Sequence, residues 1–207
     1  DLNNCLYKIT KTKHVQKFVL SILIALCCYA ANGQYDVKDI PQDLLKNANL
    51  IKRSYELRVD IKDPGKARYY RRYAYTIMNE AADDYAYFYD YYDKFRDIVS
   101  ISGTLYDASG KKIKTVKKKE IADESGTNGN NLADDARIKM HNFYHKNYPY
   151  TVEYEVEVEL NGLFNLPEWQ PMSGPEMAIE KSSLTVVAPK NYTLRYKQLR
   201  YNGEPIV

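Results

Sequence analysis

Two histidines have the spacing of a metal site. His141 and His145 are four residues apart, so on one face of a helix their imidazoles could share a metal ion. Asp134 and Asp135 lie near enough in sequence to be considered as further ligands. However, no glutamate follows His141 to act as a general base, and the Asn-Tyr-Pro of residues 147–149 would break a helix directly afterwards. We therefore expect two solvent-exposed histidines ahead of a strand, and no metal site.

A second candidate for metal binding is the segment Asp123–Asn131. Its side chains carry many oxygens, which are the ligands that calcium prefers. The segment lacks the regular ligand spacing of a calcium-binding loop. A hydrated surface loop is the expectation here.

Six lysines lie close together in residues 111–119. They are Lys111, Lys112, Lys114, Lys117, Lys118 and Lys119. Ile113 and Val116 alternate with them, which predicts a strand whose lysines protect the edge of a sheet. The same lysines could also face the glutamates of residues 153–159 across neighbouring strands. Binding of an acidic polymer is the functional alternative.

Tyrosine is unusually frequent, with 21 residues, and it is densest between residues 85 and 92. The alternating positions are Tyr85, Tyr87, Tyr89 and Tyr91. Successive side chains of a strand point to opposite faces, so these four rings would share one face and Ala86 and Phe88 the other. A tyrosine can pack its ring on protein and leave its hydroxyl in water. We expect a tyrosine-covered outer face. The functional alternatives are a platform for a partner protein or neighbouring domain, and stacking on sugar rings.

The chain carries none of the common catalytic motifs. It has no G-x-S-x-G, H-E-x-x-H, phosphate-binding loop or G-x-G-x-x-G sequence. Its cysteines are Cys5, Cys27 and Cys28, all ahead of residue 34. Once a leader ending at residue 33 is removed, neither a thiol nucleophile nor a disulfide remains. We expect no catalytic residue, cofactor or metal in this chain.

The leader itself is indicated by an apolar run at residues 18–31. Lysines precede the run, and Ala31 and Gly33 are small, so the pattern predicts a signal peptide over residues 1–33 that is cleaved before Gln34. If translation begins at Val15, residues 1–14 are not part of the protein. The run is too short for a stable membrane span. We expect an exported protein, periplasmic or associated with the cell surface.

Removal of the leader changes the net charge of the chain. The whole sequence has 30 basic and 27 acidic residues, and removal of residues 1–34 takes away four lysines and one aspartate, which leaves 26 of each. A chain with no net charge gives no electrostatic reason to expect nucleic-acid binding.

Beyond a lead-in at residues 34–49, the apolar pattern is that of strands. In residues 152–160, five apolar side chains alternate with four glutamates, so one face is buried and the other is acidic. A short helix is expected over residues 132–140, and an irregular crossover over 161–175. The strand candidates are residues 50–62, 67–79, 85–91, 97–107, 111–118, 150–160, 178–188 and 192–201. This predicts an all-β fold, a mainly antiparallel β-sandwich of about eight strands over residues 50–207 with one short helix, truncated at its C-terminal end.

Four segments together resemble a known family. They are residues 102–113 (Ser-Gly-Thr-Leu-Tyr-Asp-Ala-Ser-Gly-Lys-Lys-Ile), 147–155 (Asn-Tyr-Pro-Tyr-Thr-Val-Glu-Tyr-Glu), 167–171 (Pro-Glu-Trp-Gln-Pro) and 179–189 (Ile-Glu-Lys-Ser-Ser-Leu-Thr-Val-Val-Ala-Pro). Their order and spacing are similar to those of the domain of unknown function that opens exported transglutaminase-like proteins of Gram-negative bacteria. The similarity covers roughly residues 45–207.

The resemblance implies a partner within the same protein. In that family, a papain-like transglutaminase domain with a Cys-His-Asp triad follows the β-rich domain. No cysteine lies beyond residue 34 here, so no catalytic residue can be carried over. The resemblance therefore implies a non-catalytic accessory domain, whereas the alternative is a stand-alone module that binds glycan or protein through the tyrosine-rich strand.

Overall fold

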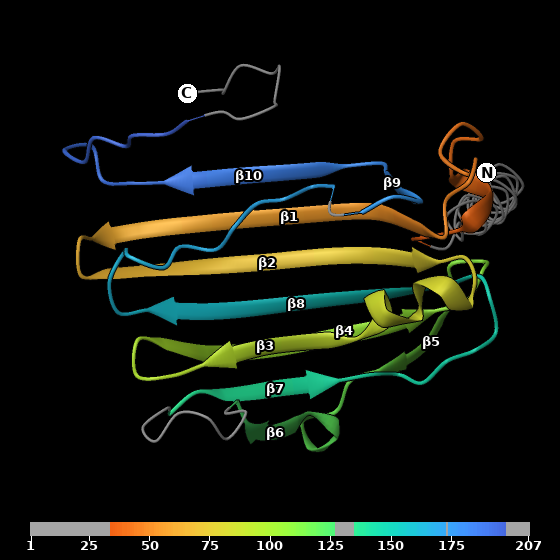
Figure 1. The fold of residues 1–207 in the computed structure, drawn as a ribbon, viewed down its shortest axis with the longest axis horizontal. Helices are drawn as coiled ribbons and strands as arrows, with labels where there is room; N and C mark the ends of the chain where they lie inside the picture. The colour runs from red at the N-terminus through yellow and green to blue at the C-terminus, as the bar shows by residue number, and fades with distance from the viewer. Residues whose placement is uncertain (1–33, 127–134, 173, 198–207) are drawn as a thin grey trace, which may run out of the picture.

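The computed structural model describes residues 34–126, 135–172 and 174–197, which form two β-sheets (Figure 1). The larger sheet has seven strands in the order β10-β1-β2-β8-β4-β5, with β9 also beside β1, and the smaller has the order β3-β7-β6. The all-β fold predicted from the sequence is confirmed. In these described ranges, no helix has the length and apolar character needed to cross a membrane.

The bounds of the elements are as follows. The seven-stranded sheet contains β1 (Leu50–Asp63), β2 (Lys66–Ile77), β4 (Arg96–Tyr106), β5 (Lys112–Thr115), β8 (Tyr150–Leu160), β9 (Met177–Ile179) and β10 (Ser182–Val187). The three-stranded sheet contains β3 (Phe88–Tyr92), β6 (Ala122–Ser125) and β7 (Arg137–His141). The described residues also form three short 3-10 helices, η2 (Val37–Asp39), η3 (Glu80–Ala86) and η4 (Lys118–Glu120).

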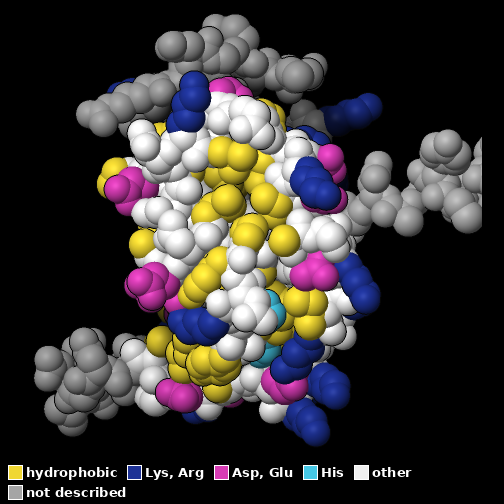
Figure 2. Space-filling model, turned by 90° about the vertical axis from the view of Figure 1, so that its right-hand side faces the viewer, with side chains coloured by type: hydrophobic (Ala, Val, Ile, Leu, Met, Phe, Trp, Pro, Cys, Tyr) yellow, Lys and Arg dark blue, Asp and Glu magenta, His cyan; other side chains and the backbone are white. Residues whose placement is uncertain are grey.

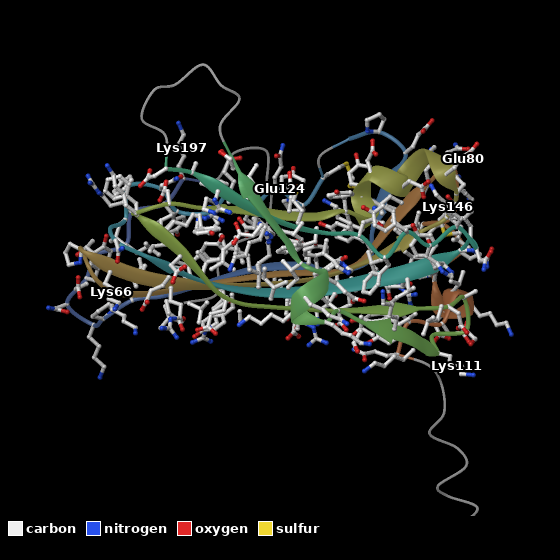
Figure 3. The ribbon with its side chains drawn as sticks, turned by 90° about the horizontal axis from the view of Figure 1, so that it is seen from below. Lys66, Glu80, Lys111, Glu124, Lys146 and Lys197 are labelled. Carbon is white, nitrogen blue, oxygen red and sulfur yellow. The ribbon has the colours of Figure 1, made fainter. Side chains whose placement is uncertain are left out.

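Strand β8 shows how the sequence pattern builds the larger sheet. Val152 and Val158 are fully buried, whereas Glu155 between them is exposed on the opposite face. We call the buried side the core face and the glutamate side the open face. Figure 3 views the sheets edge-on and places Glu124 of β6 in a layer on one side of the seven-stranded sheet, which is its core face.

Aromatic rings join the two layers. Seen from the end that lies on the right in Figure 1, hydrophobic side chains run down the middle of the molecule and charged side chains lie to either side (Figure 2). Phe88 of β3 stacks on Tyr154 of β8, with ring centroids 5.1 Å apart, and Phe143 lies against the same tyrosine at 5.7 Å. Gly103 of β4 makes room for this ring, because a Cβ at that position would lie 2.7 Å from Tyr154 Cδ1. Tyr154 is therefore a buried core residue that both sheets contact.

Most strand pairs are antiparallel, as expected, but β9 and β10 run parallel to β1. The chain can enter these strands only after residues 161–176 have carried it back across the core face (Figure 1). The described residues of this crossover, 161–172 and 174–176, form no helix or strand, in agreement with the expectation for residues 161–175.

Two expected elements are wrong. A helix is expected over residues 132–140, but the described part of this segment forms strand β7. Arg137–His141 pairs with both β3 and β6. This tertiary pairing overrides a weak helical pattern. The strand expected at 192–201 does not form over residues 192–197, which have no ladder partner in the described part of the chain. Its last four residues lie outside the described ranges, as does the predicted signal peptide.

The lead-in packs on the open face of the larger sheet. Tyr35 is buried against Tyr106, with ring centroids 5.1 Å apart, and Val37 N donates to Ala108 O at 2.9 Å. Arg53 Nη1 donates to Asp36 O at 3.1 Å. These contacts fix the beginning of the lead-in, residues 35–37, to the larger sheet.

Candidate functional site

The tyrosine-rich segment forms the outer face of the smaller sheet, although with three tyrosines rather than four. On β3, Tyr89 and Tyr91 point outward while Phe88 and Asp90 are buried. Tyr87 is exposed and caps η3. Tyr85 instead lies on η3, with its hydroxyl near Gly174 of the crossover, because the chain is a 3-10 helix there and loses the strand alternation. We define the tyrosine face as Tyr87, Tyr89 and Tyr91.

The neighbours of this face make it largely apolar. Met140 of β7 lies opposite Tyr89, and Ile138 lies opposite Tyr91. Tyr89 is the most exposed of the three rings, at 69%. Exposed Tyr144 lies close enough to Tyr87 to raise the pKa of its hydroxyl, with partial burial as a second cause. An exposed aromatic surface of this kind is suited to contact another molecule.

Tyr91 is held more firmly than Tyr89. Asn165 Nδ2 donates to the Tyr91 hydroxyl at 3.2 Å, and the guanidinium carbon of Arg96 lies 4.0 Å from the centre of its ring. A cation over the face of an aromatic ring is attractive. The crossover and β4 therefore fix one end of the tyrosine face.

A buried charge centre lies directly behind this face. Asp90 accepts hydrogen bonds from Arg96 and from Arg71 Nη2, the latter at 2.8 Å. The hydroxyl of Tyr69 lies 3.4 Å from Asp90 Oδ2. The pKa of Tyr69 is raised, first by burial and second by the negative charge of Asp90. The centre joins β3 of the smaller sheet to β2 and β4 of the larger one. It positions the tyrosine face and was not predicted, because its members are far apart in sequence.

A second buried carboxylate lies on the open face. Glu153 accepts hydrogen bonds from the Tyr35 hydroxyl at 2.7 Å, the Tyr106 hydroxyl at 3.0 Å and Arg72 Nη2 at 2.6 Å. Burial alone would raise the pKa of Glu153, but these donors outweigh it and lower that pKa. Burial and the bond to Glu153 raise the pKa of Tyr106 to about 12. With its donors supplied by the fold, this carboxylate anchors the lead-in.

The two histidines are not brought together. His141 is only 4% exposed, so the expectation of a solvent-exposed residue is wrong for it. Its Nδ1 lies 2.7 Å from the Tyr154 hydroxyl, and burial lowers its pKa. His145 packs edge-on against Tyr150, at 5.0 Å between ring centroids. In the ranges that the structure describes, no three metal-binding side chains form a group.

The charged segments have partners other than those considered from the sequence. Glu157 pairs with Arg68 at 2.5 Å, and Arg68 also reaches Glu159, whereas Lys114 pairs with Glu120 at 3.1 Å. The described ion pairs therefore do not join the lysines of residues 111–119 to the glutamates of β8. Strand β5 lies at the edge of the larger sheet, as expected. Of the candidate calcium loop, Asp123 pairs with Arg137 at 2.8 Å, and residues 127–131 lie outside the described ranges.

The sequence of one protein family matches residues 63–207: a domain of unknown function with a solved structure, DUF3857. The chain belongs to this family. The search of curated proteins finds no match.

Twenty chains among the solved structures resemble this DUF3857 chain. One is a crystal structure named "putative protease" from Parabacteroides distasonis, with a TM-score of 0.58 and 9% sequence identity. The similarity covers 69% of this chain and 29% of that one. At this identity the likeness shows a shared fold. The chain thus spans less than a third of the longer protein that it resembles.

Proposed function

We propose that this chain is a non-catalytic accessory domain of an exported protein with a protease-like or transglutaminase-like catalytic domain. The observation that carries the proposal is the partial coverage of a longer chain: the same fold occupies 29% of a protein named as a protease. The resemblance to domains that open transglutaminase-like proteins supports the same arrangement. The predicted signal peptide supports export to the periplasm or the cell surface.

The polar groups of the domain also favour a scaffold. The buried carboxylates Asp90 and Glu153 are each bound by arginine and tyrosine side chains of the fold itself. A catalytic acid or base needs access to substrate and a pKa near the working pH. Glu153 has a lowered pKa and is buried, so it meets neither requirement. In this account the domain supports or orients the catalytic domain and carries out no chemistry.

The proposal is tested with the natural protein as its gene encodes it, with and without residues 34–207. We expect peptide hydrolysis or acyl transfer only when the downstream domain is present, and a changed KM for large substrates when residues 34–207 are removed. N-terminal sequencing of the exported protein should begin at Gln34. Turnover of a substrate by purified residues 34–207 alone would contradict the proposal, as would a natural protein without a catalytic domain.

A second candidate function is binding of glycan or protein through the tyrosine face. The observation that favours it is the fixed, exposed Tyr91 beside the freely exposed Tyr89. The double variant Tyr87→Ala, Tyr89→Ala should lose affinity for a ligand and keep the urea midpoint of the parent. Soluble glucan oligosaccharides and muropeptides are the glycan probes, read by calorimetry. Ile113→Ala, on exposed β5 of the other sheet, is the matched control.

A further inference from the structure

The second layer of the sandwich covers only part of the core face. The smaller sheet lies over β8 and β4, where Phe88 stacks on Tyr154. Over β1 and β10 the core is covered by the crossover, and Ala188 and Tyr192 of the segment after β10 also pack against it. Neither segment contains a helix or a strand in its described residues. Figure 1 shows this difference, with β3, β7 and β6 lying toward the β4 and β5 edge of the seven-stranded sheet and away from β10.

Apolar side chains remain exposed in the half without a sheet. Leu184 of β10 is the register partner of fully buried Leu57, yet it is 43% exposed. Leu194 and Tyr196 are also exposed. We call Leu184, Leu194 and Tyr196 the apolar ledge. In Figure 3, Lys197, which follows the ledge, lies on the same side of the larger sheet as Glu124 of the smaller sheet. Leu184 points to the core face as well, because it is the register partner of Leu57.

Residues 192–197, which carry Leu194 and Tyr196 of the ledge, have the sequence of a strand. Tyr192, Leu194 and Tyr196 alternate with polar residues, and Tyr192 already packs against the core. Alternation of this kind is typical of a strand with one buried face. Residues 192–197 have no strand neighbour in the described part of the chain. What the segment lacks is a partner strand.

The two edges of the larger sheet are protected differently. At β5, Lys112 and Lys114 are exposed, and charged side chains discourage another strand from adding to an edge. At β10 the sequence Ser-Ser-Leu-Thr-Val-Val contains no charge. Among the described strands β10 pairs only with β1. The edge beside the apolar ledge thus has none of the lysines that protect β5.

We propose that polypeptide beyond Val207 supplies at least one strand to this half of the molecule, covers the apolar ledge and completes the second layer over β1 and β10. The family match runs to Val207, and the similar solved chain is far longer than this one. The proposal rests on the proposed function only in requiring that the natural protein continues past Val207. It does not require that the continuation be catalytic.

Trypsin provides the test, because Arg195 and Lys197 are exposed cleavage sites within the ledge segment. Cleavage there should be about tenfold or more slower in the natural protein than in a chain ending at Val207, since an added strand must open before the protease can act. Cleavage at Lys112 on β5 should proceed at the same rate in both proteins. Equal rates at Arg195 and Lys197 would overturn the proposal.

A matched pair of variants assigns the effect to the ledge. Leu184→Glu should restore rapid cleavage at Arg195 and Lys197 in the natural protein, because a carboxylate at position 184 would be buried under the added strand. Ile113→Glu, at a side chain of similar exposure (48%) on β5, should leave the rate unchanged. If the chain ending at Val207 instead forms a dimer that Leu184→Glu dissociates, a second copy is the occupant and the proposal is wrong. A natural protein that ends soon after Val207 would also refute it.

The outcome is separable from that of the proposed function. If the downstream polypeptide protects the ledge but shows no hydrolase or acyl-transfer activity, the proposed function fails and this inference stands. If the downstream polypeptide is an active enzyme but leaves Arg195 and Lys197 open to trypsin, the proposed function stands and this inference fails.

Discussion

The two halves of the core face differ in how they are covered. Over β8 and β4, a second sheet packs its rings on Tyr154 and is joined to the larger sheet through Asp90. Over β1 and β10, the crossover is held by separate polar contacts, such as the bond from Lys52 Nζ to Pro171 O at 2.6 Å. The first half has the ring packing and paired charges of a domain interior. The second buries the apolar side chains of β1 but leaves Leu184 of β10 partly in solvent.

The difference shows what makes a layer cohesive. A sheet satisfies its own backbone groups and presents all its inward side chains together, so a single buried ring such as Phe88 is backed by neighbouring strands. An irregular segment must be fixed one contact at a time. We therefore expect substitutions in the first half to reduce the stability of the whole domain, and comparable substitutions in the second half to have only local effects.

The largest expected effect is at the ring that joins the layers. Phe88→Ala should reduce the free energy of unfolding of residues 34–207 by about 3–5 kcal/mol, because it leaves a cavity against Tyr154. Leu184→Ala, in the other half, should change it by less than about 0.5 kcal/mol. Urea unfolding followed by circular dichroism measures both values. Similar losses for the two variants would remove the distinction between the halves.

A somewhat smaller loss is expected at the buried charge centre. Asp90→Asn removes the countercharge of Arg71 and Arg96 but retains one acceptor, so we expect a loss of about 3 kcal/mol, the lower end for breaking a buried ion pair. The matched control is Asp123→Asn, whose exposed pair with Arg137 should leave the urea midpoint unchanged. An unchanged midpoint for Asp90→Asn would show that the centre does not join the sheets.

His141 should add a modest dependence on pH. Burial lowers its pKa below the ordinary value of 6.5, so the unfolded chain takes up a proton more readily than the folded one as the pH falls. Stability should therefore decrease as the pH falls below about 7, through 6.5 and on to the lowered pKa of the folded state. Urea midpoints at about pH 7.5 and about pH 5.5 measure this decrease. His141→Phe should remove it, and a parent protein that is equally stable at both values would contradict the assignment.

The smallest effect is expected on the tyrosine face. Tyr89→Ala should change the unfolding free energy by less than about 0.5 kcal/mol, because that ring is mostly in solvent. Phe88 and Tyr89 are adjacent on β3, so the pair compares the two faces of one strand. A large loss from Tyr89→Ala would mean that the ring supports the fold and would argue against a binding role.

Local patterning predicted the larger sheet well. The alternation at residues 152–160 gave the strand and its buried face, and the boundaries of β1, β2 and β4 follow the same pattern to within a few residues. The smaller sheet was predicted only in part. Strand β7 is five residues long, and its register partners on β3 are 45 to 53 positions away in sequence (Tyr92 with Arg137, Phe88 with His141), so no local signal distinguishes it from a helical turn.

The candidate site, too, was predicted only in part from the sequence. Period-two spacing placed Tyr89 and Tyr91 on an outer face, but it could not show that Tyr85 lies on a 3-10 helix. The Asp90 centre depends on strands β2, β3 and β4 meeting in space, and such contacts are set by topology. The role of Glu153 was missed because it has the same alternation as the exposed glutamates of β8.

Hydrogen exchange of residues 34–207 tests the contrast between the two halves most directly. If a sheet covers one half of the core face and irregular segments cover the other, amides of β8 and β3 should exchange only through global unfolding, whereas those of β10 and residues 192–197 should exchange at least about tenfold faster. Protection of β10 and residues 192–197 equal to that of β8 would contradict the account.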